Sequence, residues 1–204
     1  MLNKIIYDHI KDGLTENGNR SSGRTDKLHN GILNYIREKI PNFDKKYNVF
    51  HEKSIKCTYG NNFKIDILIE DKKGNIISCI LLKAFISSVQ KNRANNANTT
   101  QGEIFRIKGL PGREDVKVWF ISLIANETPS YKNDGTLRTM ESVETSYVDL
   151  SKLENRPNIY HSTIKYDLLD ISYDTKKSFR NSLNIKKIKN ITENTLIKNA
   201  KQIF

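Results

Sequence analysis

Two charged residues inside neighbouring apolar runs are the most chemically suggestive feature of the sequence. Asp66 stands in the run 65–69, and Lys83 stands in the run 80–85. A carboxylate or an ammonium group is costly to bury unless it is paired or helps to bind a metal ion. The turn between the runs, residues 71–75, is short, so we expect two adjacent antiparallel strands with Asp66 beside Lys83. The pattern alone fits a cross-strand ion pair as well as a metal site.

An acidic residue on one strand followed by a lysine on the next resembles the PD-(D/E)XK nuclease superfamily, particularly its type II restriction endonucleases. In that family an acid lies on the second core strand and Glu-x-Lys on the third. The two carboxylates and a backbone carbonyl hold a divalent cation against the scissile phosphate, and the lysine orients or activates the attacking water. The resemblance covers about residues 25–125 and implies a Mg²⁺ site with Asp66 and the Leu82 carbonyl as ligands and Lys83 as the catalytic lysine.

The sequence departs from the family pattern at Leu81, which occupies the position where the family has Glu or Asp two residues before the lysine. Leucine cannot bind a metal ion, so two explanations compete. In the first, another carboxylate supplies the ligand, as in some family members; the candidates are Glu52, Glu38 and Glu103. In the second, the acid has been lost by evolution or by engineering. We favour the second, because Glu at position 81 would make this run an ordinary family match.

A polar segment rich in amides follows the lysine, at residues 87–106. Asparagine, glutamine and arginine are the side chains that read base edges and phosphates in DNA grooves. A solvated loop of biased composition is the competing interpretation, but the position directly after the motif favours DNA contact. The candidate DNA-binding residues are Gln90, Lys91, Asn92, Arg93, Asn95, Asn96 and Asn98.

Composition and charge narrow the class of protein. The chain has 204 residues, 37% of them hydrophobic and 28% charged, which is enough for one globular domain with a core. We treat it as a single domain spanning 1–204, in which residues 126–204 complete the domain or add dimer or DNA contacts. The net charge of +11 favours a polyanionic partner, although a lysine-rich solvated surface would give the same charge. The basic tail, residues 175–204, has the same two interpretations.

The cysteines and the apolar segments bear on the compartment. Cys57 and Cys79 lie in strand-like runs without CxxC spacing, so we expect buried free thiols instead of a disulfide or a zinc site. No window is long and apolar enough for a membrane span, and the first residues lack the apolar core of a signal peptide. These features predict a cytoplasmic protein without membrane contact.

Hydrophobic spacing predicts the elements that would position these residues. Helical spacing marks residues 25–40 and, weakly, 1–14; strand-like runs cover 47–57, 63–70, 76–86 and the doubly buried 117–125; and a helix is expected within 87–108. Residues 126–146 are predicted to be a polar loop, the short run 147–150 fits a strand or a connector, and 158–173 are mixed. The predicted fold is α/β (α+β): a central mixed β-sheet flanked by helices, with a restriction-endonuclease-like core.

The resulting hypothesis is a sequence-specific endonuclease that cleaves duplex DNA by Mg²⁺-dependent phosphodiester hydrolysis. A short symmetric recognition site would imply a two-fold homodimer. Because of Leu81, this chain could be an inactive form. The alternatives are a DNA-binding protein of the same fold that does not cleave, and a repair or junction-resolving nuclease.

Overall fold

The computed structural model describes residues 1–12, 22–57, 61–134, 136–143, 156–174 and 183–204, without the side chains at 22–24, 90, 91, 93, 173 and 183. The helices are α1 (Leu2–Lys11), α2 (Ser22–Lys39), α3 (Phe43–Lys46), α4 (Val89–Lys108) and α5 (Asn194–Ile203). The strands are β1 (Tyr47–Lys56), β2 (Asn62–Asp71), β3 (Ile76–Phe85), β4 (Lys117–Ala125), β5 (Glu127–Tyr131), β6 (Leu137–Ser142), β7 (Ile159–Tyr173) and β8 (Leu183–Lys189).

The centre of the molecule is a six-stranded mixed sheet with the strand order β1-β2-β3-β4-β7-β8. The strands β1, β2 and β3 form the expected antiparallel meander, and β3, β4 and β7 run parallel to one another. β8 closes the far edge by pairing antiparallel to β7. Parallel neighbours need a crossover, and α4 supplies the one between β3 and β4. The predicted α/β (α+β) architecture, a mixed sheet flanked by helices, is therefore confirmed.

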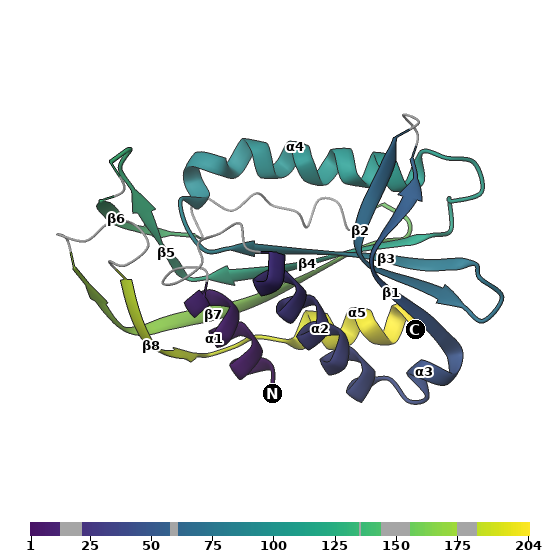
Figure 1. Ribbon diagram of the computed structural model, residues 1–204, viewed down its shortest axis with the longest axis horizontal. Helices are drawn as coiled ribbons and strands as arrows, with labels where there is room; N and C mark the ends of the chain where they lie inside the picture. The colour runs from purple at the N-terminus through teal and green to yellow at the C-terminus, as the bar shows by residue number, and fades with distance from the viewer. Residues whose placement is uncertain (13–21, 58–60, 135, 144–155, 175–182) are drawn as a thin grey trace.

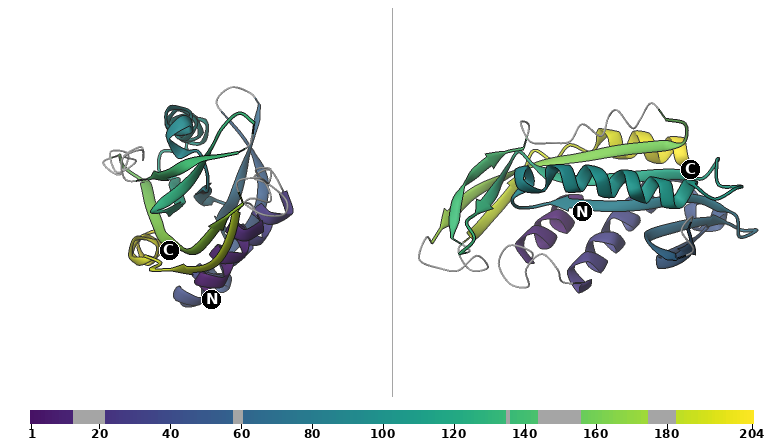
Figure 2. Two further views of the ribbon diagram at one scale, coloured as in Figure 1. Left: turned by 90° about the vertical axis from the view of Figure 1, so that its left-hand side faces the viewer. Right: turned by 90° about the horizontal axis from the view of Figure 1, so that it is seen from above.

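Helices cover the two faces of this sheet unequally. Of the described helices, α4 lies along one face, whereas α1, α2, α3 and α5 lie on the other, as two perpendicular views agree (Figures 1 and 2). Under α4, a core cluster joins Leu68, Leu81 and Phe120 to Ile104 and Ile107 of the helix. A larger cluster fills the opposite face with side chains from α1, α2 and α5. β4 is buried along nearly its whole length, as its unbroken apolar sequence predicts.

The predicted helix at residues 25–40 corresponds to α2, whose buried side chains recur at helical spacing. Leu28, Ile32 and Ile36 are each at most 2% exposed and face the sheet. α1 packs closely against α2 at Gly31. A Cβ atom at this position would stand 2.6 Å from Cγ2 of Ile5, so the close approach requires glycine.

Three regions differ from the sequence predictions. Residues 126–146, expected to be a loop, contain the β5–β6 hairpin in their described part. The mixed segment 158–173 forms β7, and the tail adds the strand β8 before its helix α5. Residues 147–150 lie outside the described residues. The loop prediction rested on the polar composition of residues 126–146. Pro129 is tolerated in β5 because the strand belongs to a two-stranded sheet, where a missing donor costs little.

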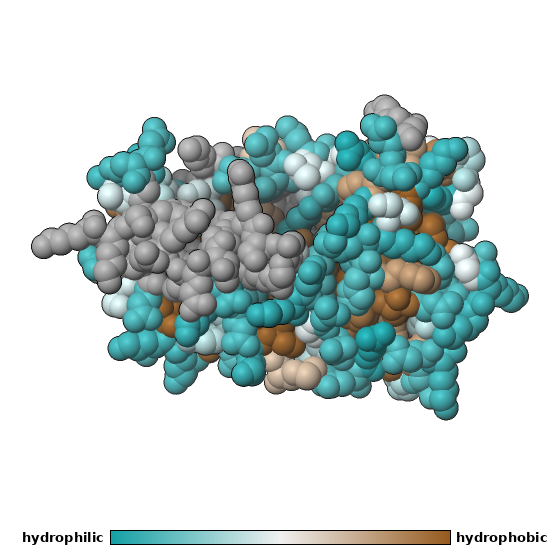
Figure 3. Space-filling view, in the orientation of Figure 1, coloured by the Kyte–Doolittle hydropathy of each residue, from teal (hydrophilic) through white to brown (hydrophobic). Residues whose placement is uncertain are grey.

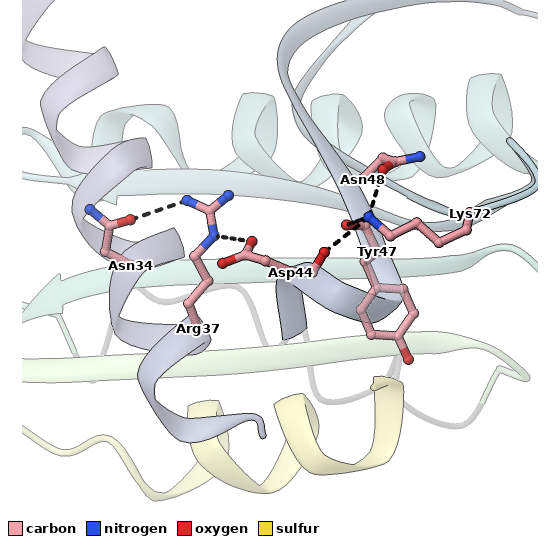
Figure 4. Close-up of polar contacts among 6 residues, drawn as sticks. All are labelled: Asn34, Arg37, Asp44, Tyr47, Asn48 and Lys72. Carbon is pink, nitrogen blue, oxygen red and sulfur yellow. Dashed lines mark hydrogen bonds and ion pairs between the residues drawn. The ribbon is translucent and has the colours of Figure 1, made fainter. Parts of the chain in front are cut away.

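The β2–β3 turn is fastened to the helical layer by Lys72. Its ammonium group donates hydrogen bonds to the carbonyls of Asp44 and Tyr47 at 2.9 and 3.0 Å, and to Oδ1 of Asn48 at 2.9 Å (Figure 4). Asp44 in turn accepts a hydrogen bond from Nε of Arg37 on α2 at 2.9 Å. These contacts tie α2, α3 and β1 to the hairpin whose two strands carry the predicted motif.

Candidate active site

Asp66 lies where β2 separates from β3. The pairing of the two strands reaches Ile67 and Ile80 and is not continued past them. Extended by one residue, this register would set Asp66 opposite Leu81. Instead, Oδ2 of Asp66 accepts a hydrogen bond from the backbone N–H of Leu82 at 2.8 Å, so the carboxylate stands in for a strand carbonyl. Its Oδ1 has no hydrogen bond to a described residue and is available to a ligand.

The separation of the strands coincides with a bend in the β1–β2 hairpin. Glu52 of β1 lies opposite Asp66 and has a φ of 49°, in the left-handed region that interrupts a strand. Beyond this point the hairpin turns toward the face covered by α4 (Figures 1 and 2). The Nη1 of Arg113 holds the bent end by donating to the carbonyl of Lys56 at 2.7 Å. The bend opens the sheet at Asp66.

Lys83 on β3 points toward α4 and meets Glu103. The ammonium nitrogen and Oε1 of Glu103 are 2.6 Å apart, and the two side chains are 28% and 12% exposed. The other carboxylate oxygen, Oε2, is buried and has no hydrogen-bond partner among the described residues. A buried carboxylate oxygen without a partner is costly, and a bound cation would relieve that cost. The lysine of the motif is therefore paired with one of the three alternative acids.

Leu81 lies in the core beneath α4. It is 1% exposed and belongs to the cluster that contains Ile104 and Ile107 of the helix. Its neighbours there are apolar, among them Ile65 and Cys79. Leu81 is therefore an ordinary core residue, and a carboxylate introduced at this position would be surrounded by hydrocarbon.

The other two alternative acids, Glu52 opposite Asp66 and Glu38 on α2, form no ion pair with Lys83. Glu52 forms an ion pair with Lys64 on β2, and the hydrogen bond from Lys64 lowers the pKa of this carboxyl below its usual range. Glu38 is exposed on α2, in the last turns of the helix. Of the three, only Glu103 contacts Lys83.

His29, which the sequence analysis did not select, lies near Asp66 from the opposite side of the sheet. It is 2% exposed on α2, and burial lowers its pKa below the usual value although the negative charges of Asp66, Asp26 and Glu52 act in the opposite direction. The histidine therefore favours its neutral form. A signal existed in the sequence, since His29 falls on the apolar stripe with Ile32 and Ile36, where a polar side chain is unexpected.

No preformed metal cluster accompanies these residues. Within the described part of the chain, no group of three or more His, Cys, Asp or Glu side chains is arranged so that it could hold a metal ion. Asp66 and Glu103 belong to different elements, β2 and α4, and each contacts a neighbouring residue of β3, Leu82 and Lys83 respectively. A cation at this place would have to draw on backbone oxygens, water or phosphate in addition to the two carboxylates.

The amide-rich segment forms the first half of α4. Asn92, Asn95 and Asn98 are exposed and Asn96 is half-buried, whereas the side chains of Gln90, Lys91 and Arg93 lie outside the described residues. Next to these amides, the end of β3 and the start of α4 enclose a hollow of about 310 Å³. It is lined by Ala84, Phe85, Ile86, Ser87, Val89, Asn92, Asn95, Asn96 and Thr99. The hollow begins directly after Lys83.

Comparison with known proteins gives no family: no family model, no curated protein and no solved structure matches the chain. The two cysteines are free and buried, as expected, and burial raises the pKa of Cys79 to about 12. None of the described helices has the length and apolar character needed to cross a membrane. On the face seen in Figure 3 the described surface is largely hydrophilic, with apolar atoms mainly over the region of β1–β3.

Proposed function

We propose that this chain is a Mg²⁺-dependent endonuclease of duplex DNA, similar to the type II restriction endonucleases. The observation that carries the proposal is the ion pair between Lys83 and Glu103, whose nitrogen and oxygen are 2.6 Å apart. The residue before Lys83, Leu82, donates its backbone N–H to Asp66, so both acids contact adjacent residues of β3. An acid on the second strand, a lysine on the third and a further acid beside the lysine are the three side chains that such chemistry needs.

The acid missing at position 81 is supplied, in this proposal, by Glu103. Its support is twofold: Glu103 contacts the motif lysine, and its Oε2 is buried without a partner in the described residues. Leu81, by contrast, is part of the core under α4. The relocated acid replaces the loss of the acid as our preferred explanation, and the chain is then an active enzyme.

Each side chain has a role that follows from its position. Oδ1 of Asp66 and Oε2 of Glu103 would bind the cation, and the Leu82 carbonyl would add a ligand, since the N–H and carbonyl of one strand residue leave on the same edge. Bound Mg²⁺ would polarise the scissile phosphate and activate an attacking water. Lys83 would orient that water or offset the charge of the phosphate. Because Lys83 engages only Oε1, Glu103 can bind metal without breaking the ion pair.

Charge and surface chemistry support DNA as the substrate. The net charge of +11 would attract a polyanion, and the exposed amides of α4 begin at Asn92, nine residues after Lys83 in the sequence. Amide side chains recognise base edges, so they would supply sequence specificity where the basic residues supply affinity. A short two-fold recognition sequence would require a homodimer.

A DNA-binding protein without cleavage activity is the second candidate. The absence of a three-ligand metal cluster among the described residues favours it, as does the ion pair that already neutralises Glu103. The two candidates share DNA binding and differ only in Mg²⁺-dependent hydrolysis, so one assay separates them.

The test uses supercoiled plasmid DNA with Mg²⁺ or with EDTA. The unchanged chain should convert the plasmid into nicked, linear or fragmented forms only with Mg²⁺, and Asp66→Asn should remove this activity while the amide oxygen still accepts the Leu82 hydrogen bond and preserves the fold. Glu38→Gln, an exposed change on α2, is the matched control and should cleave normally. Cleavage by Asp66→Asn at the unchanged rate would refute the proposed site. Duplex binding without cleavage by any of the three would favour the second candidate.

A further inference from the structure

The hollow at the start of α4 has an unusual lining. Four of its residues, Asn92, Asn95, Asn96 and Thr99, follow one another at intervals of three, one and three, which places them on a single face of the helix. The remaining lining comes from the end of β3 and the segment that leads into α4, including Phe85. One helical face of neutral hydrogen-bonding groups thus forms one wall of the hollow.

The lining identifies the kind of ligand. None of the nine lining residues is charged, so the hollow suits neither a phosphate group nor a metal ion. Asn95 and Asn96 make no side-chain hydrogen bond to a described residue, so both donor and acceptor groups are available. Asparagine amides form paired hydrogen bonds with the edges of nucleobases, adenine above all. The chemistry therefore matches a neutral, planar heterocycle.

Size and shape support the same ligand. A volume of about 310 Å³ is at the lower limit of small-molecule sites, which span roughly 300–1,000 Å³, so it suits one base or nucleoside. Phe85, which also packs against Val89, Ile124 and Val143, belongs to the lining, and bases stack on aromatic rings in sites for unpaired nucleotides. A concave surface cannot reach base edges inside an intact groove, which instead admits a projecting helix or ribbon. Only a base that has left the stack can enter a hollow.

We propose that the hollow between the end of β3 and the first half of α4 receives a single unstacked base of the bound DNA. The hollow begins at Ala84, directly after Lys83, so the base would lie next to the phosphate under attack. The amide stripe then recognises the edge of that base, and Phe85 packs against its ring. This inference rests on the proposed function, because it assumes that DNA is bound across Lys83.

The test compares two duplexes of about 20 base pairs that differ only at the central pair, in EDTA so that no metal-dependent cleavage occurs. One is fully paired, and the other has a central 2-aminopurine opposite a mismatched base, which lowers the cost of extrusion. The unchanged chain should bind the mismatched duplex about tenfold more tightly, because the mismatch removes part of the cost of unpairing and unstacking the base. Asn95→Leu and Asn96→Leu should abolish that preference, whereas Gln101→Leu, an exposed amide on the same helix outside the hollow, should keep it.

The outcomes separate this inference from the proposed function. Equal affinity for the two duplexes, or a preference that survives in Asn95→Leu and Asn96→Leu, overturns the base pocket; the nuclease proposal then stands if plasmid cleavage persists. If the chain binds neither duplex, both proposals fall. Free adenosine should not displace the mismatched duplex, since it lacks the phosphate contacts. Displacement by adenosine alone would assign the hollow to free nucleosides and overturn DNA as the source of the base.

Discussion

At the scale of single residues, the site depends on which acid accompanies Lys83. The sequence pattern placed the expected acid at position 81, because residues two apart on a strand share a face. That reasoning holds for a strand with an open face, but the face of β3 at Leu81 is covered by α4. Lys83, two residues closer to the end of the strand, is still 28% exposed and finds its partner on the covering helix. A carboxylate on α4 can therefore reach the lysine without displacing the core.

Leu81→Glu tests this account directly. The substitution would bury a charge among Ile65, Ile104 and Ile107, so we expect the free energy of unfolding to fall by more than about 2 kcal/mol, as for other buried unpaired charges. Chemical denaturation monitored by circular dichroism measures this change. Leu81→Met, which keeps the volume and the apolar character, is the control and should cost less than about 1.5 kcal/mol.

The opposite result would restore the alternative explanation. If Leu81→Glu folds with unchanged stability and cleaves plasmid DNA faster than the unchanged chain, position 81 is the true place of the family's acid. Glu103 would then be only a partner for Lys83 in an ion pair.

At the scale of elements, periodicity predicted the parts of the fold with one clear face. The helix at 25–40 and the three meander strands have regular apolar spacing, the strand at 117–125 is a nearly continuous apolar run, and all of them are present. Periodicity did not predict the strand β8, and the reason is physical. Ile185 and Ile188 are three residues apart, a helical interval, yet both are 2% exposed in one cluster. The partner strand has Asp170 at a φ of 53° opposite this interval, and that irregularity lets both side chains reach the core.

The sequence also predicted part of the candidate site, namely its two motif residues and a set of three alternative acids. Asp66 and Lys83 stood out because a charge inside an apolar strand needs a reason, and Glu103 was among the acids proposed to replace the missing one. The choice among three acids could not be made from the sequence, because Glu103 lies twenty residues from Lys83 and meets it only through the packing of α4 on the sheet. The proximity of His29 to Asp66 likewise depends on how α2 packs.

The reactivity of the Cys79 thiol reports whether α4 shields this face of the sheet from solvent. This thiol lies in the cluster beneath the helix, is fully buried, and has a pKa that burial raises to about 12. Thiolate is the reactive form, so we expect no reaction with a thiol reagent such as dithionitrobenzoate at neutral pH in the folded protein. Full reaction should appear only in denaturant. Rapid modification of Cys79 in the native chain, resolved from Cys57 by a Cys57→Ala variant, would contradict the packing of α4.

At the scale of the whole molecule, the positive charge should govern binding to DNA. If the basic residues neutralise phosphates, affinity for duplex DNA should fall by roughly 10³–10⁵ between about 50 and 200 mM salt for about 6–10 phosphate contacts. Fluorescence anisotropy with a labelled duplex at several salt concentrations gives the slope. An affinity that hardly changes with salt would indicate that the charge of +11 serves only to solvate the surface.

The central claim is that Glu103 supplies the second carboxylate of a Mg²⁺ site with Asp66. The most direct measurement is the rate of supercoiled plasmid cleavage as a function of Mg²⁺ concentration, for the unchanged chain and for Glu103→Gln, with duplex binding measured on both. The account predicts Mg²⁺-dependent cleavage by the unchanged chain, a rate more than about a hundredfold lower for Glu103→Gln at every Mg²⁺ concentration, and equal DNA affinity. Equal cleavage rates for the two chains, or no cleavage by a folded unchanged chain that binds DNA, would contradict it.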